Sequence, residues 1–207
     1  MPVPYHIQKR QEELARRQWN LAEIEARFNR LVENGIPLKT LDRKKTLHEK
    51  EAILDRVQCR AEDYCYLMGN CAKSSATALL EEFGLGNLEI IRALGPFPGL
   101  AMSGGICGPV TGGLIALGLF FSNPDITQHD ATQAYRHARM FTKRFETAMG
   151  SLYCPDIQEI LLGKYYDPMS SKENMKAFNA SNARTNCVIA PGIGARIAAE
   201  IMMESMA

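Results

Sequence analysis

Residues 104–121, GGICGPVTGGLIALGLFF, decide the fold of this chain. Cys107 and Gly108 precede a proline, Pro109, which suits the first turn of a helix because its missing N–H would be unpaired there anyway. No charged residue occurs between Arg92 and Asp125. A helix that is apolar all round belongs in the middle of a protein. The sequence therefore predicts a buried central helix from about residue 109 to residue 121.

Small residues recur every four positions in this helix, at Gly108, Gly112 and Ala116. On one helix they form a smooth ridge that lets a second backbone approach closely. A bilayer needs roughly 20 apolar residues, so this helix is too short to span one, and we expect no membrane insertion.

The rest of the chain shows helical patterns with recognisable ends. Helices are expected from about residue 40 or 42 towards 66 and over residues 72–83, 87–94, 130–149, 155–162, from about 170, and over 188–203. β-Branched alternation is nearly absent, so we predict an all-α helical bundle.

Residues 1–58 form a charged N-terminal arm in this interpretation, and residues 59–207 form a four-cysteine domain. Gln8 to Glu33 is expected as one long helix, ended by Gly35. Its apolar stripe comprises Leu21, Ile24, Phe28 and Leu31, which step by three, four and three residues. The stripe either covers the chain's own domain or makes a homodimer, since a long arm can reach a neighbouring chain.

Composition limits the functional class. The net charge is +1 with both signs spread along the chain, so nucleic acid is not expected as a partner. The N-terminal residues lack the apolar core of a secretory signal. Six cysteines without such a signal indicate a cytoplasmic protein whose thiols bind metal or do redox chemistry.

Four cysteines occur where helices are expected to begin: Cys71, Cys107, Cys154 and Cys187. A helix N-terminus offers free N–H groups and a positive dipole end, which lower the pKa of a thiol. If the four converge, they make an iron–sulfur site, a zinc site or a redox thiol centre. A Cys₃His site using His129 or His137 stays open.

Other cysteine patterns are missing or less informative. No CxxC pair occurs, which disfavours a zinc finger and a thioredoxin-like dithiol. Cys59 and Cys65 would point roughly 120° apart on one helix, and we expect both to pack as small apolar groups outside the site. No acid–base set stands out, so catalytic residues are unknown and enzymatic activity stays open.

The motif Cys107-Gly-Pro-Val-Thr-Gly112, with single cysteines at 71, 154 and 187, resembles the C-GCAxxG-C-C family of redox-active proteins. The same domain is similar to the N-terminal part of split-Soret cytochrome c. Pro109 replaces the alanine of the CGAxxG motif, and residues 1–58 have no counterpart in the minimal family unit.

The resemblance implies an iron–sulfur cluster, with [2Fe–2S] favoured and [4Fe–4S] open, held by Cys71, Cys107, Cys154 and Cys187. Gly105, Gly108 and Gly112 would leave room for the cluster and supply N–H donors. The implied role is electron transfer or redox sensing with an unidentified redox protein as partner. Because the similar cytochrome is dimeric, the resemblance also favours the homodimer over a cover on the chain's own domain. The alternatives are a metal-free thiol–disulfide protein and a structural zinc or interaction module.

Overall fold

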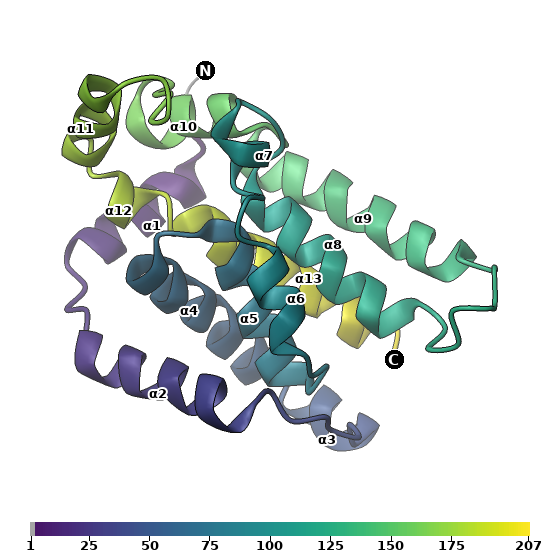
Figure 1. Cartoon of the computed structure of the whole chain (residues 1–207). Helices are drawn as coiled ribbons and strands as arrows, with labels where there is room; N and C mark the ends of the chain where they lie inside the picture. The colour runs from purple at the N-terminus through teal and green to yellow at the C-terminus, as the bar shows by residue number, and fades with distance from the viewer. Residues whose placement is uncertain (1–2) are drawn as a thin grey trace.

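The computed structural model describes residues 3–207, which form a bundle of helices (Figure 1). These residues form no strand, and two isolated antiparallel bridges pair Leu38 with Leu85 and Ile106 with Tyr153. The predicted all-α class is confirmed. The helices are α1 (Tyr5–Ala15), α2 (Leu21–Asn34), α3 (Arg43–His48), α4 (Lys50–Met68), α5 (Cys71–Phe83), α6 (Leu88–Ala93), α7 (Gly99–Met102), α8 (Gly108–Phe121), α9 (Thr132–Met149), α10 (Cys154–Leu162), α11 (Lys172–Ala180), α12 (Ala183–Asn186) and α13 (Ile189–Glu204).

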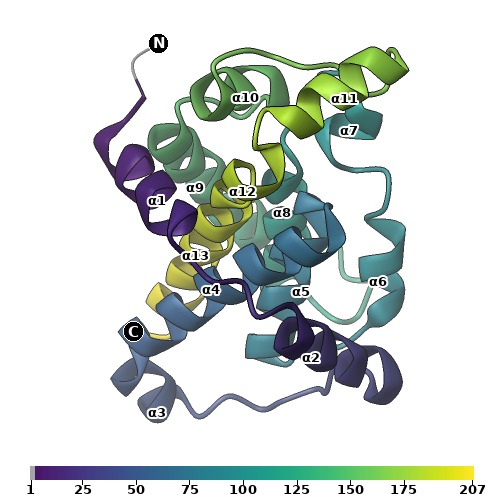
Figure 2. The ribbon, with the colours of Figure 1, turned by 90° about the vertical axis from the view of Figure 1, so that its left-hand side faces the viewer.

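The core is made by α4, α5, α8, α9 and α13, and α13 packs against the other four (Figure 2). The helical segment 183–204 is long and apolar enough to cross a membrane by length and composition. Of its most apolar 18 residues, however, 72% are buried inside the bundle. The core helix of a compact protein meets the same criteria, so this helix adds no independent support for a membrane span.

The predicted glycine-rich helix is α8, which lies against α5, α9 and α13. Its small residues allow a close crossing with α5, because a methyl group on Gly112 would overlap the carbonyl oxygen of Ala72. A methyl group on Gly108 would overlap the sulfur of Cys71. The ridge predicted from the four-residue spacing therefore sets the distance between the two helices that carry Cys71 and Cys107.

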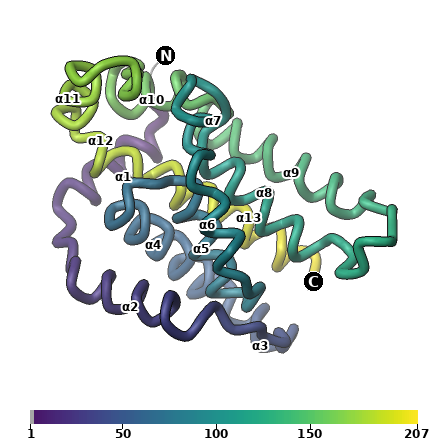
Figure 3. The backbone as a smooth tube through the Cα atoms, viewed as in Figure 1, coloured from purple at the N-terminus to yellow at the C-terminus, as the bar shows by residue number. Residues whose placement is uncertain are grey.

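The arm differs from the single helix expected over Gln8–Glu33. The chain leaves the helix after Ala15, and Asn20 starts α2 by accepting a hydrogen bond from the backbone N–H of Glu23. A side-chain cap of this kind stabilises a new helix start. Figure 3 shows the chain passing from α1 to α2 along one side of the bundle.

The apolar stripe of the arm faces its own chain. Ile24 and Leu31 are buried, and Phe28 packs edge-on against the ring of Tyr64 with centroids 5.8 Å apart. Leu21 stays exposed. The boundary placed at residue 58 falls inside α4, and the arm contributes to the same core cluster as the rest of the chain.

Two buried carboxylates on α4 fix the arm in place. Glu62 accepts hydrogen bonds from Arg10 and Arg17, and Asp63 accepts them from Arg17 and Arg27, at 2.6 Å and 2.8 Å. The Glu62 side chain has no solvent exposure. Burial raises the pKa of Glu62, and the guanidinium of Arg10 opposes that rise. The arm thus supplies the positive charge that these two acids need inside the fold.

Candidate functional site: a cysteine-lined cavity

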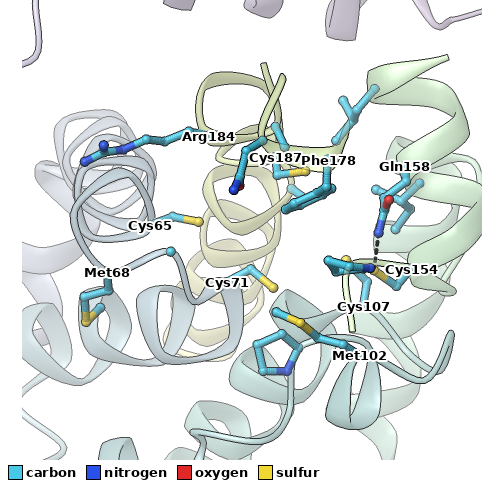
Figure 4. A pocket seen from close by; sticks show the side chains of 18 of the residues that line it. Cys65, Met68, Cys71, Met102, Cys107, Cys154, Gln158, Phe178, Arg184 and Cys187 are labelled. Atoms are coloured by element: carbon cyan, nitrogen blue, oxygen red, sulfur yellow. Dashed lines mark hydrogen bonds between the residues drawn. The ribbon is translucent and has the colours of Figure 1, made fainter. Parts of the chain in front are cut away.

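A cavity of about 490 Å³ lies where the end of α4, the starts of α5 and α8, and residues of α10, α11 and α12 meet. Its wall includes five cysteines: Cys65, Cys71, Cys107, Cys154 and Cys187. Figure 4 shows their side chains, from five separate segments, around one space. The structure therefore brings together the four cysteines singled out in the sequence.

Cys71 is placed by a sharp turn between two helices. Gly69 ends α4 in the left-handed conformation, at φ 63°, and Asn70 caps α5 by accepting a hydrogen bond from the N–H of Lys73 at 3.0 Å. Cys71 is the first residue of α5. The helix start expected at Cys71 is confirmed.

A short antiparallel pairing sets Cys107 beside Cys154. The N–H of Cys107 donates to the carbonyl of Leu152 at 2.8 Å, and the N–H of Cys154 donates to the carbonyl of Gly105 at 2.9 Å. Cys107 is the N-cap of α8 and Cys154 is the first residue of α10. Two helix starts, 47 positions apart in the sequence, are thus held side by side.

The pKa values of this pair move in opposite directions. A hydrogen bond from Cys107 is the main cause that lowers the pKa of Cys154 to about 7, and a hydrogen bond from Gln158 at 3.4 Å contributes. Hydrogen bonding to Cys154 and to Cys71, together with burial, raises the pKa of Cys107 well above its ordinary value. The directions of these two shifts favour a thiolate at Cys154 beside a protonated thiol at Cys107.

Cys187 does not begin a free helix as the sequence suggested. It directly follows α12, with helical backbone angles, and leads into α13. Burial raises the pKa of its thiol well above the ordinary value. The expectation that every helix start lowers the thiol pKa is therefore wrong for Cys187 and Cys107, where the neighbouring thiols and burial outweigh the helix dipole.

Cys65 and Cys59 also differ from expectation. Cys65 lines the cavity with the other four, because the turn at Gly69 folds the last turn of α4 alongside the start of α5. Cys59 lies outside the cavity as predicted, but it is exposed rather than packed as an apolar group. The sequence feature that could have placed Cys65 in the site is the turn at Gly69 and Asn70. This turn puts Cys65 and Cys71 on two different helices, so the two side chains can face the same space.

Gly105, Gly108 and Gly112, which were predicted to contact a cofactor, make contacts within the protein itself. The N–H of Gly105 donates to the carbonyl of Gly99 at 2.9 Å, and Gly108 and Gly112 face α5. Gly104, rather than these three, is part of the cavity wall. Their contact with a cofactor remains a prediction.

The cavity wall, as far as the described residues define it, contains no histidine and no carboxylate. His137 instead stacks on Phe121, with ring centroids 3.7 Å apart. Within residues 3–207 no three histidine, cysteine or carboxylate side chains are grouped tightly enough to hold a single metal ion. The wall therefore offers sulfur ligands, and no three of its described cysteines are grouped tightly around one point.

A stack of side chains links the arm to the cavity wall. The guanidinium of Arg17 lies over the ring of Trp19 at 4.4 Å, and that ring stacks on Tyr66 with centroids 4.1 Å apart and planes parallel within 1°. Arg184 lies over the Tyr66 ring at 4.5 Å and donates to its carbonyl oxygen at 3.2 Å. Tyr66 and Arg184 are both part of the wall, so the arm supports the site from outside.

The fold and the site define an all-α protein with a thiol-lined cavity built from helix ends. A protein-family model described as "Putative redox-active protein (C_GCAxxG_C_C)" matches residues 69–201. The chain belongs to this family of redox-active proteins. No curated protein and no solved structure matches the chain. Cys65 and the whole arm lie outside the matched residues.

Proposed function

We propose that the protein binds an iron–sulfur cluster through Cys71, Cys107, Cys154 and Cys187 and uses it for electron transfer or redox sensing. The observation that carries the proposal is the convergence of these four thiols on one cavity. Thiolates are the usual ligands of iron–sulfur clusters. When bound, the cluster would supply one-electron chemistry.

The spacing of the thiols supports a cluster over a single zinc ion. Four thiolates on one zinc must each lie about 2.3 Å from the metal. The described side chains show no such tight group, whereas a cluster extends over several atoms and takes more widely spaced ligands. Arg184 in the cavity wall provides positive charge next to a site that would carry negative charge when loaded.

Metal analysis of anaerobically purified protein tests the proposal. We expect iron and acid-labile sulfide with visible absorption, and we favour two irons per chain because of the split-Soret resemblance. Stoichiometric zinc without sulfide would instead support the structural zinc module.

A second candidate function rests on the Cys107–Cys154 pair. The Cys154 thiolate would attack one sulfur of a substrate disulfide, forming a mixed disulfide and releasing the first substrate thiolate. Cys107, once deprotonated, would then attack the sulfur of Cys154, form the Cys107–Cys154 disulfide and release the second substrate thiol. Two electrons pass from the protein to the substrate.

This candidate predicts a pH profile for the metal-free, reduced protein. Because the pKa of Cys154 is lowered to about 7, its alkylation by iodoacetamide should rise through pH 7 rather than through pH 9. Replacing Gln158 with leucine removes the hydrogen bond to the sulfur and should move the midpoint upward. A Cys154 midpoint near 9 in the unaltered chain would contradict the lowered pKa. Peptide mapping identifies the alkylated cysteine.

We also propose a homodimer, as the resemblance implies, but one formed by a surface other than the apolar stripe of the arm, since Ile24 and Leu31 are already buried. Light scattering of the full chain should give twice the 23.0 kDa of one chain. Ile24→Lys should lower the thermal stability and leave this mass unchanged. A mass of 23.0 kDa for the unaltered chain would contradict the dimer. If Ile24→Lys dissociated the dimer, the apolar stripe of the arm would form the interface after all.

A further inference from the structure

The cavity holds thioethers as well as thiols. Met68, Met102 and Met175 are part of the wall, in addition to the five cysteines. Figure 4 shows Met102 beside Cys71 and Cys107, whereas Met68 is turned away from the cysteines. Thiolates and thioethers together favour a soft monovalent cation such as Cu(I). Hard cations prefer charged oxygen ligands, and the wall, within the described residues, contains no carboxylate.

Met102 is held in place by an unusual stretch of backbone. Gly99, Leu100, Ala101 and Met102 all have positive φ, at 53°, 47°, 61° and 56°. Positive φ is unfavourable for the three of these residues that carry side chains. Such strain is found where the surrounding structure enforces it, often at functional sites.

Hydrogen bonds fix this left-handed turn against the thiol pair. The N–H groups of Ala101 and Met102 donate to the carbonyls of Pro96 and Pro98, at 2.6 Å and 2.8 Å. A methyl group on Gly99 would lie 3.4 Å from the sulfur of Cys154. The turn therefore places the Met102 thioether in the same wall as Cys107 and Cys154.

We propose that Cys107, Cys154 and Met102 form a binding site for a soft monovalent cation of the Cu(I) class. Such a cation needs only two or three sulfur ligands. The two thiols are already neighbours, because the backbone pairing of Ile106 with Tyr153 holds Cys107 beside Cys154. The site goes beyond the proposed redox function: it shares two thiolates with the cluster site, so the cation and the cluster exclude each other.

The test is an anaerobic Cu(I) titration of the reduced, full-length, cluster-free protein against a chromophoric Cu(I) chelator. We expect the unaltered chain to withdraw one Cu(I) from the chelator. Cys154→Ser should abolish this transfer, and Met102→Leu should weaken the affinity by about tenfold or more. Met68→Leu is the matched control, a methionine of the same wall that points elsewhere, and it should bind as the unaltered chain does.

Three results would overturn the site: no transfer of Cu(I), full affinity in Cys154→Ser, or equal affinities for Met102→Leu and Met68→Leu. Met102→Ala serves as a second variant if leucine disturbs the left-handed turn, with circular dichroism to verify folding. The titration needs no iron, so its result is independent of the iron and sulfide analysis that tests the proposed function.

Discussion

Anaerobically purified Cys107→Ser is expected to carry less than about a tenth of the iron and sulfide of the unaltered protein. Cys107 interacts with two other thiols of the cavity, because Cys154 and Cys71 both raise the pKa of its thiol. It is also 4% exposed, so no other donor from solvent can take its place easily. Iron, sulfide and visible absorption should all fall together.

Two cysteine variants serve as controls for this loss. Cys59→Ser changes an exposed thiol outside the cavity and should leave the iron content unchanged. Cys65→Ala removes a buried thiol of the cavity wall that lies outside the residues matched by the family, and it should leave the cluster mostly intact. If the iron content of Cys107→Ser equalled that of Cys59→Ser, Cys107 would not be a ligand of the cluster.

Gly112→Ala is expected to lower the free energy of unfolding by about 1–3 kcal/mol, because the added methyl group overlaps the carbonyl oxygen of Ala72 and pushes α8 away from α5. The reduced, metal-free chain should show this in thermal unfolding, as a lower Tm by about 2–4 °C per kcal/mol. The same movement separates Cys71 from Cys107, so the iron content should also fall.

Gly118→Ala is the matched control on the same helix. A methyl group there meets nothing within 4 Å. Alanine also favours the helix over glycine by about 0.5–1 kcal/mol, so stability should rise slightly. If Gly112→Ala were as stable as Gly118→Ala, the close crossing of α5 and α8 would not be what holds the two cysteines together.

Sequence patterns were sufficient to predict most of the helices and the close packing at the small residues of α8. The helix ends expected near residues 83, 149 and 162 are confirmed, and glycines 84, 150 and 163 end α5, α9 and α10 there in the left-handed conformation. The spacing of Gly108, Gly112 and Ala116 predicted close packing because a helix repeats nearly every four residues. Both inferences depend only on local geometry.

The arm and the cavity show where local geometry is insufficient. Arg17 interrupts the apolar spacing and Trp19 lies off the stripe, but one helix was still expected there; Asn20 and the stacking of Trp19 on Tyr66 favour a break. The pairing of Ile106 with Tyr153, which sets Cys107 beside Cys154, joins residues 47 positions apart. Nothing in either local segment indicates such a contact.

The thiol pKa values illustrate the same limit. A helix start predicts a lowered pKa, and Cys154 follows that prediction. Cys107 and Cys187 move the other way because tertiary packing buries them among other thiols. The sign of the shift therefore depends on neighbours that come from distant segments, which only the folded chain identifies.

The central claim is that Cys71, Cys107, Cys154 and Cys187 hold one iron–sulfur cluster. Anomalous diffraction at the iron absorption edge, from crystals grown anaerobically, tests it most directly. We expect an iron peak inside the cavity, within bonding distance of these four sulfurs and with Cys65 unbound. Disulfides among the four cysteines with no iron in the cavity, or a zinc ion in place of iron, would contradict it.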